Sequence, residues 1–530
     1  MITKIYIQNF KSFQKFSLEL NDELNIIVGN NEAGKSTILE ALALVLTKRL
    51  GGRLIESELG AHLFNKDAVG DYLRRVQAGE KAAPPSIVIE AWLSDGQTVS
   101  ALRGSHNHEK ADAIGVRLDI AYNDEYAPEY AALLTSPADI KSLPTEFYAV
   151  DWRSFAGKAI TGRSLPVGTS YIDATAIRLQ SGTDFYLQSI VSSGMDAKER
   201  AALSVAYRGL KEKFADEPAI QAINQNLTQR KGAITDKDLA ISIDVSQRTN
   251  WEASLVPHLD DLPFHLIGKG EQSALKIMLA LERQAEDAHV ILIEEPENHL
   301  SFSSMQKLIA KVQEKCAGKQ IILTTHSAYV LNKLGMEKTI LLHNGSTTSL
   351  SKLPPDTENY FKKLSGYDTL RIILAERSIL VEGPSDELVV QRAYRAAHGR
   401  APADDGVDVI NVRGLSFPRF LDIAKQLGKT VCVVTDNDGD YQGKIVERYR
   451  PYEGCATIAI HADDDENAHT LELQIVKCNE LATLNKVLGT SHADKGTLST
   501  FMVKNKTECA LRIFESADEI AYPEYIRNAL

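Results

Sequence analysis

The hydrophobic positions near the start of the chain follow the two-residue period of β-strands. Residues 1–28 alternate apolar and polar side chains and predict two strands joined by a turn. Residues 86–96 predict a strand with a turn, and residues 116–124 alternate and predict its antiparallel neighbour. Residues 38–46, ILEALALVL, instead carry apolar side chains at helical spacing. The N-terminal region therefore predicts an α/β fold.

Helical spacing becomes dominant from residue 176. The segments 178–193, 196–214 and 218–230 each carry apolar residues at the spacing of one helix face. They contain too few heptads for a long coiled-coil arm. We therefore expect a helical insertion over residues 176–230.

Buried strands alternate with helices in the last third of the chain. Residues 378–383, 407–414 and 430–440 each contain an apolar run of strand type, and helical patterns separate them. This β-α-β-α-β order predicts a parallel sheet, and open α/β sheets place their sites at the carboxyl ends of the strands. Polar turns and two adjacent prolines precede this region, so we expect a domain boundary near Ala375.

Composition and charge narrow the class of protein. The net charge of the 530 residues is −12, so nucleic acid would have to meet local basic patches or bridging metal ions. The five cysteines form no C-x-x-C pair, which argues against zinc and disulfides and fits a reducing cytoplasm. The N-terminus alternates like a strand rather than a signal peptide, and no apolar run is long enough to span a bilayer. We expect a cytoplasmic protein without membrane contact.

Residues 29–37, GNNEAGKST, match the phosphate-binding pattern G-x-x-x-x-G-K-[ST] between a strand pattern and a helix pattern. Backbone N–H groups and the following helix N-terminus would cradle phosphates. Lys35 would reach the β- and γ-phosphates, and Ser36 would hold Mg²⁺. A glycine-rich turn with an incidental lysine is the alternative. The nucleotide-binding candidates in this loop are Asn30, Asn31, Gly34, Lys35, Ser36 and Thr37.

Two carboxylates follow the buried strand at residues 290–293. Glu294 is placed to hold the metal shell of a nucleotide, and Glu295 is placed to orient or activate the attacking water. A third strand, within residues 320–331, leads to His326, which can contact the γ-phosphate.

These segments resemble, in order and spacing, the ABC-type ATPase heads of DNA-maintenance proteins. The P-loop resembles a Walker A motif, GKGEQ at 268–272 an ABC signature, IEEPENHL a Walker B motif with its D-loop, and His326 a switch histidine. The resemblance implies that Gly270 and Gln272 also contact nucleotide. Two departures stand out: GKGEQ replaces SGGQ, and Glu294 replaces the usual aspartate, keeping the charge but reaching one carbon further.

Acidic residues follow the strands of the predicted parallel sheet. Glu382 ends the first strand, Asp386 lies near the start of the next helix, and Asp436 and Asp438 end the third strand. Clustered carboxylates suit Mg²⁺ or Mn²⁺, and two such ions can promote phosphodiester cleavage. An exposed acidic turn or a calcium loop is the alternative for DNDGD. The buried strand before it and the lack of an EF-hand glutamate favour the first interpretation.

These acids resemble those of a Toprim domain. An ATPase head followed by a Toprim domain resembles the OLD (overcoming lysogenization defect) family of ATP-dependent endonucleases. Within that family Glu382, Asp386, Asp436 and Asp438 match metal-binding acids, and Glu472 matches a further acid. Lys506 matches a lysine that acts on the cut phosphate, with Lys504 as the alternative. The resemblance thus implies a catalytic set of Glu295, His326, Glu382, Asp436, Asp438 and Lys506, and a metal-binding set of Ser36, Glu294, Glu382, Asp386, Asp436, Asp438 and Glu472.

The resemblance covers nearly the whole chain and predicts its domains. We expect an α/β protein with an ABC-type ATPase head in residues 1–175 and 231–375. The helical insertion occupies 176–230, and a Toprim nuclease domain with a parallel sheet occupies 376–530. An ABC signature normally completes the ATP site of a second head, and in this family the insertion dimerises. We therefore expect a homodimer or a larger oligomer.

Two function classes stay open. The first is a DNA endonuclease that binds and hydrolyses ATP, requires Mg²⁺ or Mn²⁺, and serves bacterial defence against foreign DNA, with or without a co-encoded partner. The second is an ATPase sensor or scaffold whose Toprim domain binds nucleic acid without cutting and acts with a partner effector. The intact set of acids favours the first. No tyrosine stands in a context of strand transfer, which argues against a topoisomerase.

Three further polar groups have two interpretations each. His106 and His108 could share a metal ion or belong to a polar loop. The acidic run at 463–466 could bind metal or be a solvated loop. Arg413 and Arg419 could meet DNA phosphates or form surface salt bridges.

Overall fold

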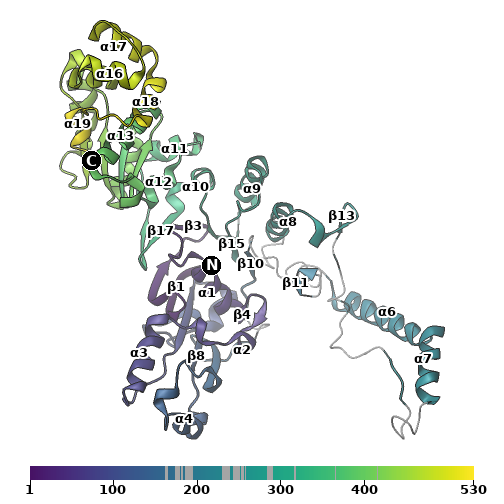
Figure 1. The fold of residues 1–530 in the computed structure, drawn as a ribbon. Coiled ribbons are helices and arrows are strands. Elements are labelled where there is room, and N and C mark those ends of the chain that lie inside the picture. The colour runs from purple at the N-terminus through teal and green to yellow at the C-terminus, as the bar shows by residue number, and fades with distance from the viewer. Residues whose placement is uncertain are drawn as a thin grey trace. The chain divides into compact units, whose positions relative to one another are not determined.

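The computed structural model describes residues 1–161, 165–173, 179–180, 183–184, 195–229, 239–242, 251, 256, 258–282, 290–315, 318–364, 366–414 and 416–530. The chain divides into two compact units. The first unit holds residues 1–23 and 36–323, and the second unit holds residues 24–35 and 324–530. Figure 1 labels the elements of both units along the chain.

An antiparallel sheet forms the N-terminal part of the first unit. Apolar side chains of its strands, such as Ile7, Ile89 and Leu118, are fully buried in the core. Ile7 pairs with Ile89, and Ile89 pairs with Leu118, so the predicted antiparallel strands are confirmed. The strands are β1 (Ile2–Phe10), β2 (Phe13–Glu19), β6 (Ile87–Leu93), β7 (Arg103–Gly104), β8 (Ala113–Tyr122) and β9 (Tyr148–Ser154).

The prediction of two strands in residues 1–28 was wrong, because this segment forms three. The polar residues 21–23 end the β1–β2 hairpin, and a further apolar run forms β3 (Leu24–Gly29) in the second unit. There β3 lies parallel to β17 (Thr339–His343), which pairs with β18 (Ser346–Ser349). A Cβ atom at Gly29 would lie 2.6 Å from the carbonyl oxygen of Leu342. Glycine is therefore needed where the strand enters the P-loop.

Parallel strands carry the acidic segment of the first unit. The buried apolar run at 290–293 forms β15 (Val290–Glu294), as predicted, and lies parallel to β10 (Thr169–Asp173). Helix α8 (Lys269–Glu282) packs against both strands. β16 (Gln320–Thr324) begins with a buried glutamine whose side chain accepts a hydrogen bond from Ile2 N and donates one to Ile2 O, both at 2.7 Å. This amide ties β16 to β1.

Two helices confirm the expected helical character of residues 197–229. They are α6 (Ala197–Ala215) and α7 (Pro218–Gln229), and Figure 1 shows them as consecutive helices. Asp196 and Glu199 form a reciprocal capping box that fixes the start of α6. In segment 178–193 the helical prediction was wrong for β11 (Leu179–Gln180) and β12 (Thr183–Asp184), which are short strands that pair antiparallel. The remainder of that segment lies outside the described residues.

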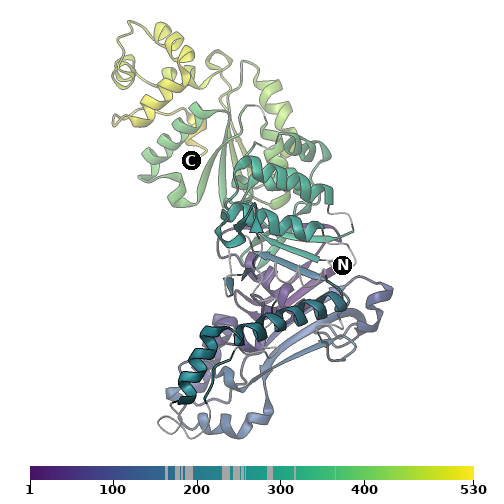
Figure 2. The same ribbon diagram turned by 90° about the vertical axis from the view of Figure 1, so that its right-hand side faces the viewer.

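A four-stranded parallel sheet organises the C-terminal part of the second unit. Its strand order is β20-β19-β21-β22, and every pairing is parallel, as the β-α-β-α-β pattern predicts. Figure 2 shows these strands side by side with helices on both faces. The strand at the edge, β22, was not predicted. The strands are β19 (Arg377–Val381), β20 (Val407–Asn411), β21 (Thr430–Val434) and β22 (Ile458–His461).

Helices cover this sheet because each strand is followed by an amphipathic segment. One face packs α13 against Ile379, Val381 and Val434, together with helices from the end of the chain. Among the described residues, no helix is long and apolar enough to cross a membrane. The helices are α13 (Pro384–His398), α14 (Phe417–Leu427), α15 (Leu471–Cys478), α16 (Leu481–Leu488), α17 (Lys495–Lys504), α18 (Lys506–Glu515) and α19 (Glu524–Arg527).

Candidate functional sites for nucleotide and metal

The glycine-rich loop turns sharply between β3 and helix α1 (Lys35–Thr47). Gly34 has a φ angle of 102°, a conformation that only glycine adopts readily. Asn30 accepts a hydrogen bond from Ala33 N at 3.2 Å through its carbonyl oxygen. The side chains of Asn30 and Asn31 are exposed at the mouth of the loop. The strand, loop and helix thus have the order that a phosphate cradle requires.

The predicted lysine of this loop is buried. Lys35 Nζ donates to the carbonyl oxygens of Gly29 at 2.9 Å and Asn30 at 3.0 Å. The ammonium therefore lies over the loop, where a bound phosphate would meet it. Thr37, in the first turn of the same helix, has its hydroxyl 3.4 Å from that of Ser12.

The predicted metal-binding serine and glutamate of the ATP site meet within the first unit. Glu294 is buried at the end of β15, and Ser36 hydrogen-bonds its carboxylate. Tyr171 Oη, from the neighbouring strand β10, donates to Glu294 Oε2 at 2.7 Å. Burial raises the pKa of Glu294; the hydrogen bonds from Ser36 and Tyr171 oppose this rise, and Asp173 and Glu40 add to it. The carboxylate is thus poised to gain from a cation beside Ser36.

Glu295 stands in a strained turn directly after the strand. Its φ angle is 45°, a left-handed conformation that costs energy for a residue with a Cβ atom. Its Oε2 accepts a hydrogen bond from Asn298 Nδ2 at 2.6 Å, and its carbonyl oxygen accepts one from Asn298 N at 3.0 Å. Asn298 thereby fixes the direction of this carboxylate.

The signature-like segment is packed inside the first unit. Gly270 is buried in the first turn of α8, and a Cβ atom there would collide with the carbonyl oxygen of His299. Gln272 is also buried, and its Nε2 donates to Ile267 O at 2.7 Å. Gly270 and Gln272 therefore both make close contacts within the first unit. His326, in the second unit, is exposed two residues after β16 and just before helix α10 (Ala328–Leu334).

The first two acids of the C-terminal sheet lie around the start of α13. Glu382 follows β19 directly, and its carbonyl oxygen accepts a hydrogen bond from Gly414 N at 2.8 Å. Asp386 lies in the first helical turn, and its Oδ2 accepts from Gly383 N at 3.1 Å. Burial and then the charge of Glu382 raise the pKa of Asp386 to about 7. The two carboxylates therefore share one electrostatic environment.

Asp436 brings a third carboxylate to the same edge from β21. Its Oδ2 accepts a hydrogen bond from Leu471 N, at the start of α15, at 3.1 Å. Burial and then the charge of Asp386 raise the pKa of Asp436 to about 8, and Glu472 and Glu382 contribute to this rise. The raised pKa means that Asp436 holds its proton near neutral pH unless a cation replaces it.

Glu472 and Lys506 complete the cluster from two helices. Glu472 is buried in the first turn of α15, and its Oε2 lies 3.4 Å from Lys506 Nζ at the start of α18. Burial lowers the pKa of Lys506, but Glu472, Asp436 and Asp386 together raise it above its ordinary value. Lys506, rather than Lys504, makes this ion pair, which favours the predicted assignment.

Asp438 occupies the more open side of the cluster. Its φ angle is 50°, and its side chain is 42% exposed. Burial and then the charge of Asp438 raise the pKa of Glu382. All the sequence-predicted acids of the parallel sheet therefore act on one another at one edge. Among the described residues, however, no three His, Cys, Asp or Glu side chains are already arranged to hold an ion.

The donor chemistry of this edge nevertheless fits divalent metal ions. Its acids supply only oxygen atoms, and hard cations such as Mg²⁺ or Mn²⁺ prefer such ligands. Glu472 Oε2 is buried, and the Lys506 ammonium at 3.4 Å neutralises its charge. Mutual repulsion and burial hold protons on Asp386 and Asp436, and a cation would relieve both.

Comparison with known protein families identifies both regions. The model described as "Overcoming lysogenization defect protein-like, TOPRIM domain" matches residues 373–438. AAA domain models match residues 4–110 and residues 170–332. The chain is an ATPase head with an OLD-like Toprim domain. The recognised architecture and the α/β fold class expected from the sequence are thus confirmed, and domains of these kinds use a nucleotide and a divalent metal ion.

Individual proteins match the chain at low identity. Endonuclease GajA of Bacillus cereus is 22% identical over 462 residues, which cover 82% of this chain and 75% of the relative. "Retron Ec83 probable ATPase" of Escherichia coli is 22% identical over 413 residues, which cover 65% of this chain and 72% of the relative. The SMC head domain from Thermotoga maritima aligns with 65% of this chain and 97% of its own, at 15% identity and a TM-score of 0.28.

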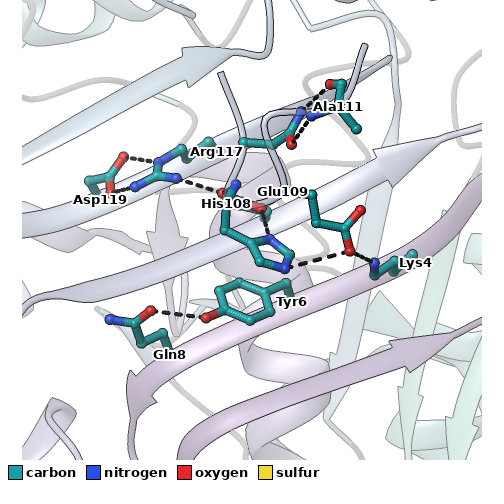
Figure 3. Close-up of polar contacts among 10 residues, drawn as sticks. Lys4, Tyr6, Gln8, His108, Glu109, Ala111, Arg117 and Asp119 are labelled. Atoms are coloured by element: carbon teal, nitrogen blue, oxygen red, sulfur yellow. Dashed lines mark hydrogen bonds and ion pairs between the residues drawn. The ribbon is translucent and has the colours of Figure 1, made fainter. Parts of the chain in front are cut away.

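The two histidines of the N-terminal polar loop of the ATPase head lie in different surroundings. Glu90 is wholly buried in β6, and its Oε2 lies 2.7 Å from His108 Nδ1. Its Oε1 accepts from Arg117 at 2.7 Å and from His108 N at 2.8 Å. The ring of His108 stacks on Tyr6 with centroids 3.6 Å apart (Figure 3), whereas His106 is exposed. These contacts favour the polar-loop interpretation for this segment.

The other polar groups of the OLD-like Toprim region also have structural partners. Asn437 Nδ2 donates to the carbonyl oxygens of Asp463 at 2.8 Å and Asp465 at 3.1 Å, so the acidic run clamps the D-x-D turn. Arg413 donates to Gly366 O at 3.2 Å. Arg419 donates to the hydroxyl of Thr357 at 3.0 Å.

Sequence reasoning missed several residues of both sites. Tyr171 belongs to no motif. Its place inside a short strand before the insertion was the only signal that its hydroxyl has a polar partner. Tyr525 is buried beside the acids, and burial followed by the charge of Asp436 raises its pKa. Lys444 and Arg448 follow the D-x-D motif closely and both act on the charge of Glu382. Their positions, six and ten residues after Asp438, were the available signal.

Proposed function

We propose that this protein is a DNA endonuclease that binds and hydrolyses ATP, requires divalent metal ions, and serves bacterial defence against foreign DNA. The observation that supports it best is the convergence of Glu382, Asp386 and Asp436 at one edge of a parallel sheet. Burial and mutual repulsion hold the pKa of Asp386 at about 7 and that of Asp436 at about 8. Burial and mutual repulsion make such a group of carboxylates unfavourable by itself, and groups with raised pKa values of this kind cluster at functional sites. Similarity to an endonuclease and to a retron ATPase supports the defence setting.

The residues assigned to metal are those predicted from the sequence. Glu382, Asp436 and Asp438 would hold one Mg²⁺ or Mn²⁺ ion, and Asp386 and Glu472 would act as outer or second-ion ligands. A divalent ion, when bound, would supply a Lewis acid and an activated water for phosphodiester hydrolysis. Lys506 would stabilise charge that develops on the cut phosphate, because its ammonium faces the same acids.

The ATP site would control this chemistry from the head. Lys35 and the loop amides would bind the phosphates, and Ser36 and Glu294 would hold the nucleotide's metal ion. Glu295 would orient the attacking water, and Asn298 directs its carboxylate. The domain boundaries 1–175, 176–230, 231–375 and 376–530 remain part of this proposal.

Assembly into a homodimer through residues 176–230 is also proposed. Helix α6 exposes large apolar side chains, including Val205 at 70% and Leu210 at 65%. Exposed apolar residues grouped on one element mark interaction surfaces. A second copy of the same helix is the simplest partner, since closed two-fold contacts are the commonest in oligomers.

The decisive test is cleavage of supercoiled plasmid and labelled linear DNA by the purified protein. Wild type should cut with Mg²⁺ or Mn²⁺ and should not cut in EDTA. Asp436→Ala should lose nuclease activity while its ATPase rate stays near that of wild type. Metal-dependent DNA binding without cutting would instead favour the ATPase scaffold with a partner effector. Undiminished cutting by Asp436→Ala would place the chemistry elsewhere.

A further inference from the structure

The segment behind the D-x-D turn is a π-helix that contains Lys444 and is followed directly by Arg448. It spans η10 (Gln442–Glu447), and π-helical segments are rare and frequent at functional sites. Asp440 starts it, because its Oδ1 accepts from Gly443 N and its carbonyl oxygen accepts from Lys444 N, both at 2.9 Å. This path leads back toward the acids, and Lys444 Nζ lies 3.9 Å from Asp438 Oδ2.

Hydrogen bonds fix the D-x-D turn and the start of the π-helix that follows it. Asn437 is buried, donates to the 463–465 loop, and accepts a hydrogen bond from Gly439 N at 2.9 Å. Glu466 Oε1 accepts from Tyr441 N at 3.2 Å. The direction of the π-helix relative to the acids is therefore set by the fold, and so is the approach of Lys444.

Two lysines face two of the carboxylates assigned to metal. Lys506 lies on Glu472, and Lys444 lies on Asp438. The Lys444 pair is about two-fifths exposed on each side, so it contributes little to folding. This weak pair leaves the Lys444 ammonium able to take another partner. Arg448, one helical turn further on, also acts on Glu382 from this segment.

We propose that Lys444 binds a phosphate of the nucleic-acid strand at the Toprim edge, with Arg448 beside it, once a divalent cation has taken Asp438. The inference rests on the proposed nuclease function and adds its substrate-binding group. Every charge keeps a partner in this exchange. The Asp438 carboxylate gives up the Lys444 ammonium and binds the metal ion, and the Lys444 ammonium binds a phosphate in its place. Ammonium and guanidinium groups both recognise phosphate oxygens.

The test compares Lys444→Ala with Lys486→Ala. Lys486 is a matched control, since it is also paired with an aspartate, Asp518, at 2.6 Å, but on helix α16. Binding of a fluorescein-labelled DNA duplex is measured by anisotropy with Ca²⁺ over a series of salt concentrations. Mn²⁺ binding to the full chain without DNA is measured by titration calorimetry, and wild-type cleavage with Mg²⁺ is recorded alongside.

Loss of one phosphate contact should make the slope of log K against log salt shallower by about one for Lys444→Ala. Arg448→Ala should act in the same direction, and Lys486→Ala should match wild type. Mn²⁺ affinity of Lys444→Ala should equal or exceed that of wild type, because a competitor for Asp438 is gone. An unchanged salt slope, or a loss of Mn²⁺ affinity with it, would overturn the inference. If Lys444→Ala shows this change in slope but wild type never cuts DNA, the inference about Lys444 stands and only the proposed nuclease function fails.

Discussion

Tyr171 donates its hydroxyl hydrogen bond to Glu294 Oε2 at 2.7 Å from the adjacent parallel strand. Burial raises the pKa of Glu294, and the bonds from Ser36 and Tyr171 restrain that rise. Tyr171→Phe should raise it further, so the carboxylate would form only at higher pH. We expect the acid limb of the ATPase pH profile to move to higher pH while the alkaline plateau stays near wild type. An equal loss at every pH would show that the tyrosine only packs.

Variants of the P-loop and of the second carboxylate should separate nucleotide binding from hydrolysis. Lys35→Ala should abolish binding, because the only change is the loss of the ammonium that faces the phosphates. Glu295→Gln should keep binding but slow hydrolysis strongly, since the amide cannot accept the proton of the water. Nucleotide binding and phosphate release measured on both variants check this. Hydrolysis by Glu295→Gln at the wild-type rate would refute the Walker B assignment.

Metal binding at the Toprim edge should compete with protons. The pKa of Asp386 is raised to about 7 and that of Asp436 to about 8, so both carboxyls are largely protonated below pH 7. A cation must displace these protons, and its apparent affinity should therefore fall as pH drops below about 8 and level off above it. Mn²⁺ calorimetry in buffers of different ionisation enthalpy measures the protons released.

The control for this titration is Asp436→Asn, which cannot hold the exchangeable proton. It should release fewer protons per ion and show a flatter pH dependence of whatever affinity remains. Metal binding that is independent of pH between 6 and 8 in the wild type would contradict the raised pKa values that motivate the experiment.

Self-association should depend on the apolar surface of α6. Val205→Asp places a charge on a side chain that is 70% exposed in the single chain, so it should not disturb folding but should break a dimer that buries it. Light scattering at micromolar concentration, with and without ATP, should then report a monomer. Val503→Asp, at an exposed valine of α17, makes the same substitution and should leave the oligomer intact. A wild-type monomer under both conditions would count against the proposal.

The buried carboxylate of β6 should be important for the stability of the head. Glu90→Gln removes the charge that Arg117 and His108 share, and we expect a loss of about 3–5 kcal/mol in the free energy of unfolding. Glu109→Ala removes a partly exposed partner of Lys4 and His108 and should cost no more than about 1 kcal/mol. Denaturant unfolding measures the loss in the free energy of unfolding for each variant. Equal losses would show that burial of the network contributes little to stability.

The sequence predicted the site residues that follow strands. Glu382 and Asp436 lie many residues apart, yet parallel topology brings the carboxyl ends of their strands to one edge. The pairing of Glu472 with Lys506 could not be derived in this way. Both residues begin helices that pack beyond the sheet, and no local period encodes that contact. Only the family resemblance pointed to them.

The remaining errors also have physical causes. The predicted pair of strands in residues 1–28 ignored the polar residues 21–23, which end one sheet and separate it from β3. Glu90 stands in an otherwise apolar strand, and a charge there demands a buried partner. That signal was visible, but the identity of the partner, on a strand 27 residues away, was not.

The close approach of Gly270 to His299 limits how the signature segment can be studied. A methyl group at Gly270 has no room beside that carbonyl oxygen, so even alanine must displace the backbone of the D-loop. In a saturation library scored for soluble expression, this position should tolerate glycine alone. A dead Gly270→Ala variant would consequently carry no information about whether a second head reads the signature. Genetic dissection of trans-acting ATP contacts should start from Lys269, which is exposed at the start of α8 and adds no steric conflict when shortened.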